Sequence, residues 1–273
     1  MRSNNMFWGL VFLVIGVLAL GGTLGWFGQV NVWTLIWPAF LVILGLWLLV
    51  RPSHYWRSYG HHHHHDWQTQ QVSYPLENAS QAEIELHHGA GRITVASGAD
   101  PATLLSGTFV GGVDPRLDRD GSLVLLRLHS ATDFMWGFPE NAPRGLEWNV
   151  HLNNTVPMTL DVKTGASENI LDLSDLKVTD LKVETGASST QITLPANVAY
   201  TKAKIGSGAA SVSVKVPENV SARIHVSGAI TGKHIDTARF PVSGNFYETP
   251  GYDMAANKAE IIIETGVGSV DVH

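Results

Sequence analysis

The sequence predicts a membrane helical hairpin followed by an all-β domain, in which a unit of about twenty to twenty-two residues repeats as a β-solenoid-like stack. Three observations indicate this fold class. Two long apolar runs open the chain, segments of alternating apolar and polar residues follow, and glycine-containing breaks recur at near-constant spacing. We therefore divide the chain into a transmembrane hairpin (1–52), a His-rich polar linker (53–71) and an all-β repeat domain (72–273).

Residues 6–27 and 32–50 form two long apolar runs, and no Asp, Glu, Lys or Arg lies between Arg2 and Arg51. As helices, these runs would be about 33 and 28 Å long, close to the roughly 30 Å hydrocarbon core of a bilayer. Helix is the expected state because lipid cannot satisfy exposed backbone groups. Residues 6–50 are thus expected to contact the bilayer. A cleaved signal peptide is the alternative for the first run, but no A-x-A site follows it.

Positive residues near the spans predict the orientation. Arg2 precedes the first span, Arg51 and Arg57 follow the second, and residues 28–31 between the spans carry no Lys or Arg. Positive residues near span ends are retained inside the cell. We therefore expect a two-span protein of the cell membrane with both termini in the cytoplasm.

The linker contains an unbroken run of histidines, His61 to His65. Imidazole is a common metal ligand. A homopolymeric tract, however, lacks the fixed spacing and supporting hydrogen bonds of a structural metal site. We therefore favour an unspecific linker over a metal site.

The β domain contains breaks of similar sequence, centred on Gly165, Gly186, Gly208, Gly228 and Gly266. The first four follow one another at nearly equal intervals along the chain. Between the breaks, apolar residues alternate with small or polar ones, which indicates half-buried strands. One such unit cannot bury its apolar face alone, so neighbouring units are expected to stack. We expect the glycines to allow positive φ at sharp turns.

The repeat is interrupted between about Gly111 and Trp148. This interval contains an apolar segment whose large side chains are Phe134, Met135, Trp136 and Phe138. Two interpretations stay open. The segment caps one end of the stack, or it forms an exposed contact surface for a partner or for the membrane.

No pattern in the sequence indicates a catalytic site. The chain contains no G-x-S-x-G, no H-E-x-x-H, no phosphate-binding loop and no dinucleotide-binding fingerprint. We interpret Asp172, Asp175 and Asp180 as solvent-facing residues of strands and turns. His87 and His88 are interpreted as edge residues with one ring packed and the other solvated. We therefore predict no catalytic, cofactor-binding or metal-binding residue.

Charge and cysteine content exclude further classes of function. From Trp67 onward, 15 Lys and Arg stand against 23 Asp and Glu, a net charge of −8. An acidic domain is a poor partner for nucleic acid, whose phosphates require a basic surface. The chain has no Cys, which excludes disulfides and thiol nucleophiles.

Two stretches resemble known families. Trp8–Gly16 and Trp37–Trp47 resemble the transmembrane hairpin of the LiaI/LiaF-like bacterial membrane proteins. Residues 147–217 resemble the toast-rack and putative-adhesin β domains. The second similarity lies in Val156–Val162, Gly165–Ser167, Leu171–Leu176 and Leu181–Ala187. The resemblance implies a bacterial envelope protein, and it carries over no functional residue.

Two functions follow from these features. LiaF-like proteins act as negative regulators of a stress-sensing histidine kinase, so the resemblance implies another membrane protein, such as a sensor kinase, as the partner. The first function is a membrane-anchored, non-enzymatic regulator or scaffold of the cell envelope, and it rests on the two-span anchor, the stacked β surface and the missing catalytic motifs. The alternative is an outward-facing adhesin or ligand-binding module.

Overall fold

The computed structural model of the protein describes residues 69–131 and 146–273. All of them belong to one compact unit, His65–His273. The predicted transmembrane spans and the histidine run lie outside the described residues. Within the two described ranges, no helix is both long and apolar enough to cross a membrane.

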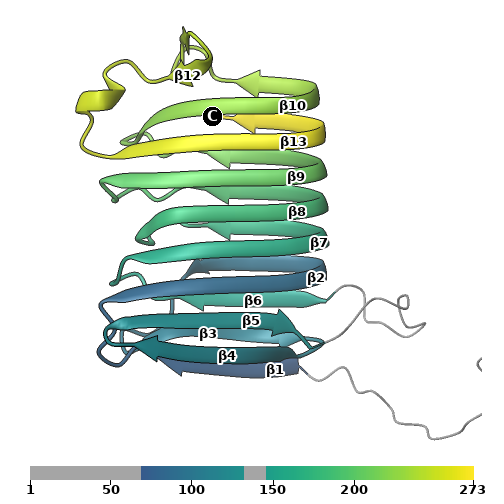
Figure 1. Ribbon diagram of the computed structural model, residues 1–273, viewed down its shortest axis with the longest axis vertical. Helices are drawn as coiled ribbons and strands as arrows, with labels where there is room; N and C mark the ends of the chain where they lie inside the picture. The colour runs from purple at the N-terminus through teal and green to yellow at the C-terminus, as the bar shows by residue number, and fades with distance from the viewer. Residues whose placement is uncertain (1–68, 132–145) are drawn as a thin grey trace, which may run out of the picture. The chain divides into compact units, whose positions relative to one another are not determined.

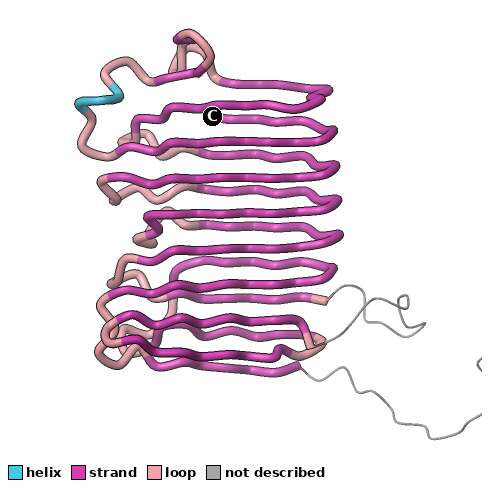
Figure 2. The backbone as a smooth tube through the Cα atoms, in the orientation of Figure 1, coloured by secondary structure: helices cyan, strands magenta, loops and turns pink. Residues whose placement is uncertain are grey.

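Six long strands form the body of the domain, and each bends near its middle into a U (Figures 1 and 2). The six are β2 (Gln81–Ser97), β7 (Met158–Asp172), β8 (Val178–Thr193), β9 (Tyr200–Lys215), β10 (Ser221–Ile235) and β13 (Lys258–Val272). We call the part before the bend arm 1 and the part after it arm 2. The arms lie in two facing layers, and the U-shaped coils pair in parallel in the order β2-β7-β8-β9-β13-β10.

The space between the two layers is filled by aliphatic side chains at alternate positions. In β8, for example, Leu181 and Val183 of arm 1 and Ile192 of arm 2 are at most 2% exposed. Aliphatic and β-branched residues favour extended backbone. Each fully buried Leu, Ile or Val contributes about 1.5–3 kcal/mol. Burial between the layers is therefore the main stabilising term of the stack.

The strand registers reproduce the spacing seen in the sequence. Leu160 of β7 lies beside Leu181 of β8, and Leu181 in turn lies beside Ala203 of β9. Each of these neighbours stands one repeat later in the chain, as the spacing of Gly165, Gly186 and Gly208 requires. The prediction of an all-β domain with stacked units is thus confirmed for this part of the chain.

The order of the last two coils differs from the order of their sequences. The regular interval between Gly208 and Gly228 implied that β10 would follow β9. Instead, β13 lies between them, with Ile263 beside Ile205 on one side and Val226 on the other. The reason is that residues 236–257 lead the chain back across the end of the stack, so its last strand fills the layer beside β9.

This returning segment is anchored by one arginine. It contains β11 (Val242–Ser243), β12 (Phe246–Glu248) and the short 3-10 helix η3 (Tyr252–Met254). Arg239 donates hydrogen bonds to the backbone oxygens of Val216 at 2.6 Å and Val220 at 3.1 Å, and to that of Pro217. β12 pairs with arm 1 of β10, and β11 pairs with β12 and ends that layer.

Five shorter strands close the opposite end of the stack. They are β1 (Thr69–Pro75), β3 (Thr103–Val110), β4 (Val113–Asp120), β5 (Leu123–Ser130) and β6 (Glu147–Leu152). β5 pairs with arm 1 of β2, and β6 pairs with arm 2. Beyond them, β4 ends the arm 1 layer, while β3 and then β1 end the arm 2 layer.

β5 and β6 therefore act as one more coil, whose bend is replaced by the chain between Ser130 and Glu147. The repeat is interrupted in the interval from Gly111 to Trp148, which nevertheless contains β4, β5 and the start of β6. Sequence periodicity missed these strands because β4 and β5 are antiparallel and do not follow the glycine spacing.

Candidate functional site

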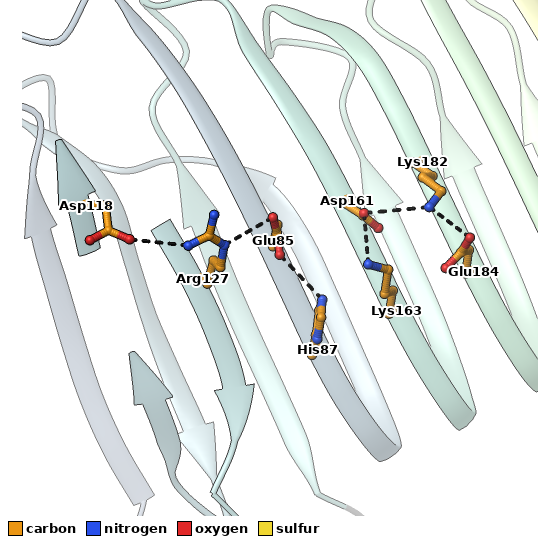
Figure 3. Close-up of polar contacts among 8 residues, drawn as sticks. All are labelled: Glu85, His87, Asp118, Arg127, Asp161, Lys163, Lys182 and Glu184. Carbon is orange, nitrogen blue, oxygen red and sulfur yellow. Dashed lines mark hydrogen bonds and ion pairs between the residues drawn. The ribbon is translucent and has the colours of Figure 1, made fainter. Parts of the chain in front are cut away.

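The outer face of arm 1 carries paired charges at alternate positions of neighbouring strands (Figure 3). On β7 and β8, Asp161 lies 3.2 Å from Lys163 and 4.0 Å from Lys182, and Lys182 lies 2.9 Å from Glu184. The hydrogen bond of the last pair raises the pKa of Lys182 and lowers that of Glu184. Both strands are thus linked by a chain of opposite charges.

A second group of charges links β2 to the end of the stack (Figure 3). Arg127 Nε donates to Glu85 Oε1 at 3.2 Å, and Arg127 Nη1 donates to Asp118 Oδ2 at 3.2 Å. Glu85 also lies 3.7 Å from His87. These residues come from β2, β4 and β5, so side chains far apart in sequence meet on one face.

A row of alternating charge crosses five neighbouring strands on the same face. In order of register, its members are Asp180, Lys202, Glu260, Arg223 and Glu248. Arg223 donates to Glu248 and, at 3.2 Å, to Asp253. The Tyr200 hydroxyl donates to Glu260, and this bond raises the pKa of Tyr200 to about 12. We call the charges of these three groups the arm 1 charge lattice.

The arm 1 charge lattice contributes little to stability, because an exposed ion pair is worth only about 0–1 kcal/mol. Its effect is to hold charged groups at regular positions, since neighbouring strands lie about 4.8 Å apart. Fixed charges of both signs favour recognition of a protein surface with complementary charge. The face is thus suited to protein binding.

A shallow groove of about 250 Å³ opens beside this face, where β10, β12 and β13 meet. It is lined by Arg223, His225, Phe246, Glu260, Ile261 and Ile262. The rings of His225 and Phe246 lie 5.7 Å apart, and Phe246 is 42% exposed. The groove therefore adds an apolar patch to the charged surface.

The two predicted histidines lie side by side with different exposure. His88 is 2% exposed and packs against Trp148 in a tilted arrangement with ring centres 4.8 Å apart, and burial lowers its pKa to about 4. His87 lies on the outer face, 4.4 Å from the ring of His129. Partial burial, followed by His129, lowers the pKa of His87. One ring is packed as predicted, but β2 is a central strand, so the assignment to an edge was wrong.

The repeated glycines form a column along the bends, and the predicted positive φ is found at only one of the five break centres, Gly228, with a φ of 122°. Neither Gly186 nor Gly208 has a positive φ. A Cβ at Gly165 would lie 2.4 Å from the carbonyl oxygen of Gly89, and one at Gly186 would lie 2.9 Å from that of Gly165. Glycine is required there because each bend packs directly on the backbone of the coil before it.

The predicted contact residues Phe134, Met135, Trp136 and Phe138 lie outside the described residues. Neither interpretation of their segment is therefore tested. The strand registers show only that the chain leaves arm 1 at Ser130 and re-enters arm 2 at Glu147, beside the bend of β2.

The arm 1 charge lattice was not predicted as a site, although the sequence singled out two of its members, His87 and the solvent-facing Asp180. Each member is an ordinary polar residue at an outward position of a strand, and its significance depends on which residue lies beside it. The repeat spacing contains this information, since it places Asp161 beside Lys182 and Asp180 beside Lys202. Across the described ranges, no three His, Asp or Glu side chains come together to hold a metal ion.

Two family models match the sequence. Residues 63–215 match the N-terminal domain of toast_rack, DUF2154, and residues 6–49 match the LiaI-LiaF-like transmembrane region. Both resemblances noted in the sequence are confirmed by these matches. No curated protein matches the chain.

Two solved structures are similar to the chain. One is described as a "putative cell adhesion protein" from Clostridium sporogenes ATCC 15579, with a TM-score of 0.68 and 20% identity, covering 75% of this chain and 98% of that protein. The other is described as a "putative adhesin" from Bacteroides fragilis NCTC 9343, with a TM-score of 0.29 and 8% identity over 76% of this chain and 97% of that one. At this identity the first likeness shows the fold alone, and the second supports no conclusion.

Proposed function

Since the chain belongs to the toast-rack N-terminal domain family and carries a LiaI-LiaF-like transmembrane region, we propose that it is a membrane-anchored regulator or scaffold of the bacterial cell envelope without enzymatic activity. On this proposal, the toast-rack domain binds another membrane protein. A stress-sensing kinase is the partner class implied by the LiaF-like resemblance.

The observation that supports this proposal is the arm 1 charge lattice. Its side chains come from strands between β4 at one end of the stack and β12 at the other, and the stack holds them in fixed register. Figure 3 shows the members on β2, β4, β5, β7 and β8. Most of these charged side chains are held by ion pairs with one another, as in a preorganised docking surface, where little side-chain freedom remains to be lost on binding.

A second function, that of an outward-facing adhesin, is favoured by one observation. The solved structure with a TM-score of 0.68 is described as a "putative cell adhesion protein". An adhesin requires the domain outside the cell, whereas a regulator of a cytoplasmic kinase domain requires it inside. The side of the membrane therefore separates the two functions.

The test inverts the sign of four charges of the arm 1 charge lattice without removing the ion pairs among them. The variant D161K/K163D/K182E/E184K keeps the net charge and the three ion pairs among these four residues, so the fold is expected to persist. A matched swap on the outer face of arm 2, R92E/E168R, exchanges a pair that lies 2.8 Å apart. A gene that encodes one of the two variants replaces the wild-type gene in each strain, and transcription from an envelope-stress reporter is measured.

We expect the arm 1 swap to give the reporter level of a gene deletion and the arm 2 swap to give the wild-type level. A deletion that leaves the reporter unchanged would contradict the regulator proposal. Loss of adhesion to surfaces in the same deletion would support the second function.

A further inference from the structure

The described part of the sheet ends in four strands that pair on one side only. They are β4 and β1 at the first end of the stack, and β11 and arm 2 of β10 at the other end. An unpaired edge presents free backbone N–H and C=O groups that can accept another strand. Each of these edges is therefore a possible point of association.

Three of the four edges carry features that oppose pairing. β4 contains a proline and several charged residues, including Asp114, Arg116 and Asp118. β11 has only two residues. Arm 2 of β10 carries Lys233 next to an irregular register between Ile230 and Gly232. Charge, proline, shortness and bulges are the devices that protect sheet edges.

β1 has none of these features over most of its length. Its sequence, Thr-Gln-Gln-Val-Ser-Tyr-Pro, carries no charge in seven residues. Its register with β3 is regular from Thr69 to Tyr74 and shifts only at Pro75. β1 thus presents a regular, neutral edge.

The core is also incompletely covered beside β1. Val72 and Tyr74 pack against the core but are only partly buried. Leu117 of β4 lies beside the fully buried Leu126, so it faces inward, yet it is 39% exposed. Among the described residues, nothing covers the apolar side chains at this end of the stack.

β1 projects beyond β4 by one strand. Past β2, the arm 2 layer contains β6, β3 and β1, whereas the arm 1 layer contains only β5 and β4 (Figure 1). One strand corresponds to about 4.8 Å. A strand added to β1 therefore does not bring the charged β4 edges of two copies into contact.

We propose that the β1 edge pairs antiparallel with β1 of a second copy of this chain. The segment is self-complementary in this arrangement. With Val72 opposite Val72 of the second copy, Gln71 lies opposite Ser73 of that copy, and Gln70 lies opposite Tyr74. The outward-pointing residues then lie opposite outward-pointing polar residues of the second copy, and no like charges are paired. The partly covered cores of the two copies become continuous. The arm 2 layers become one continuous sheet.

Charge placed on β1 tests this pairing in the full-length chain, purified in detergent and in lipid nanodiscs. Gln71 and Ser73 are both exposed and point away from the core. Q71K/S73K places lysine opposite lysine across the two-fold axis, and we expect the dimer to dissociate about tenfold more easily. Q71K/S73E places opposite charges together and restores it. Sedimentation equilibrium measures the dissociation constant, and circular dichroism checks the fold.

A single thiol provides an independent measurement, because the chain has no Cys. Side chains directly opposite each other have Cβ atoms about 4.5–5.5 Å apart. V72C is therefore expected to form an intermolecular disulfide under mild oxidation, while S189C on the central strand β8 is not. A monomeric chain, or a dimer insensitive to Q71K/S73K, would overturn the proposal. A monomeric chain is the result expected if β1 pairs instead with another segment of its own chain.

Discussion

At the scale of single residues, backbone oxygens determine where glycine is needed. Gly165 and Gly186 lie at bends where the carbonyl oxygen of the preceding coil occupies the position of a side chain. Gly206 lies in arm 1 of β9, where a Cβ would have its nearest contact at 3.9 Å. The three glycines look alike in the sequence but differ in what surrounds them.

We therefore predict different costs for two alanine substitutions. Gly165→Ala places a Cβ 2.4 Å from a backbone oxygen that cannot move away alone, and it should lower the free energy of unfolding by about 1–3 kcal/mol. Gly206→Ala meets no close atom and should be neutral or slightly stabilising. Urea denaturation of residues 65–273 measures both. Equal effects would show that close approach is not the reason for the glycine column.

The buried His88 makes stability depend on pH. Its pKa is about 4 in the folded state, below the ordinary value of 6.5. Between these values the unfolded chain holds one more proton than the folded chain, so stability rises with pH there. The contribution of neutral His88 to the free energy of unfolding is fully present above pH 6.5. It decreases by about 3 kcal/mol in all as the pH falls toward 4.

His88→Phe should therefore flatten the loss of stability between pH 7 and pH 4.5, while the packing of the ring against Trp148 is retained. Urea denaturation at several pH values measures this slope. A residual slope of the same sign is expected, because the pKa of His87 is lowered as well. His234→Gln, at an exposed position, serves as the control. An unchanged slope in the His88 variant would contradict the assignment.

At the scale of elements, the sequence predicted the coils better than their order. The alternation and the glycine spacing identified the arms and bends of β7, β8 and β9, because each depends on residues no more than one repeat apart. The position of β13 could not be predicted from spacing, because it depends on a loop that returns across the end of the stack. The charge lattice depends on the same cross-strand register.

The anchor of that loop gives a prediction for the element. Arg239→Ala leaves the carbonyl oxygens of Val216, Pro217 and Val220 without their charged donor. Hydrogen bonds to charged groups contribute about 1.5–3 kcal/mol. The variant should lose at least about 2 kcal/mol of stability in urea denaturation, and Arg239→Lys should recover only part, since one ammonium group cannot reach three acceptors. Lys215→Ala, at an exposed position, is the control.

At the scale of the whole molecule, the sequence indicates a membrane protein with a β domain, and the family matches agree. The strands that close the two ends of the stack could not be predicted from the sequence. β4 and β5 follow no repeat, and the unpaired β1 edge becomes visible only when every other strand has been placed.

The orientation of the protein in the membrane is a property of the whole molecule that the sequence predicts. Arg2, Arg51 and Arg57 flank the predicted spans, and the turn between the spans has no positive charge. We therefore expect both termini in the cytoplasm. Fusions at His273 to a reporter active only inside the cell and to one active only outside decide the question. Activity of the outside reporter would remove the regulator function and favour the adhesin.

The insertion of β13 between β9 and β10 also has a consequence for biosynthesis. β10 is synthesised before β13. When β10 is complete, the edge of β9 that pairs with β13 in the folded protein is therefore still vacant. Completion of this end of the stack therefore waits for the synthesis of β13, because a chain that ends before Lys258 lacks the strand that lies between β9 and β10.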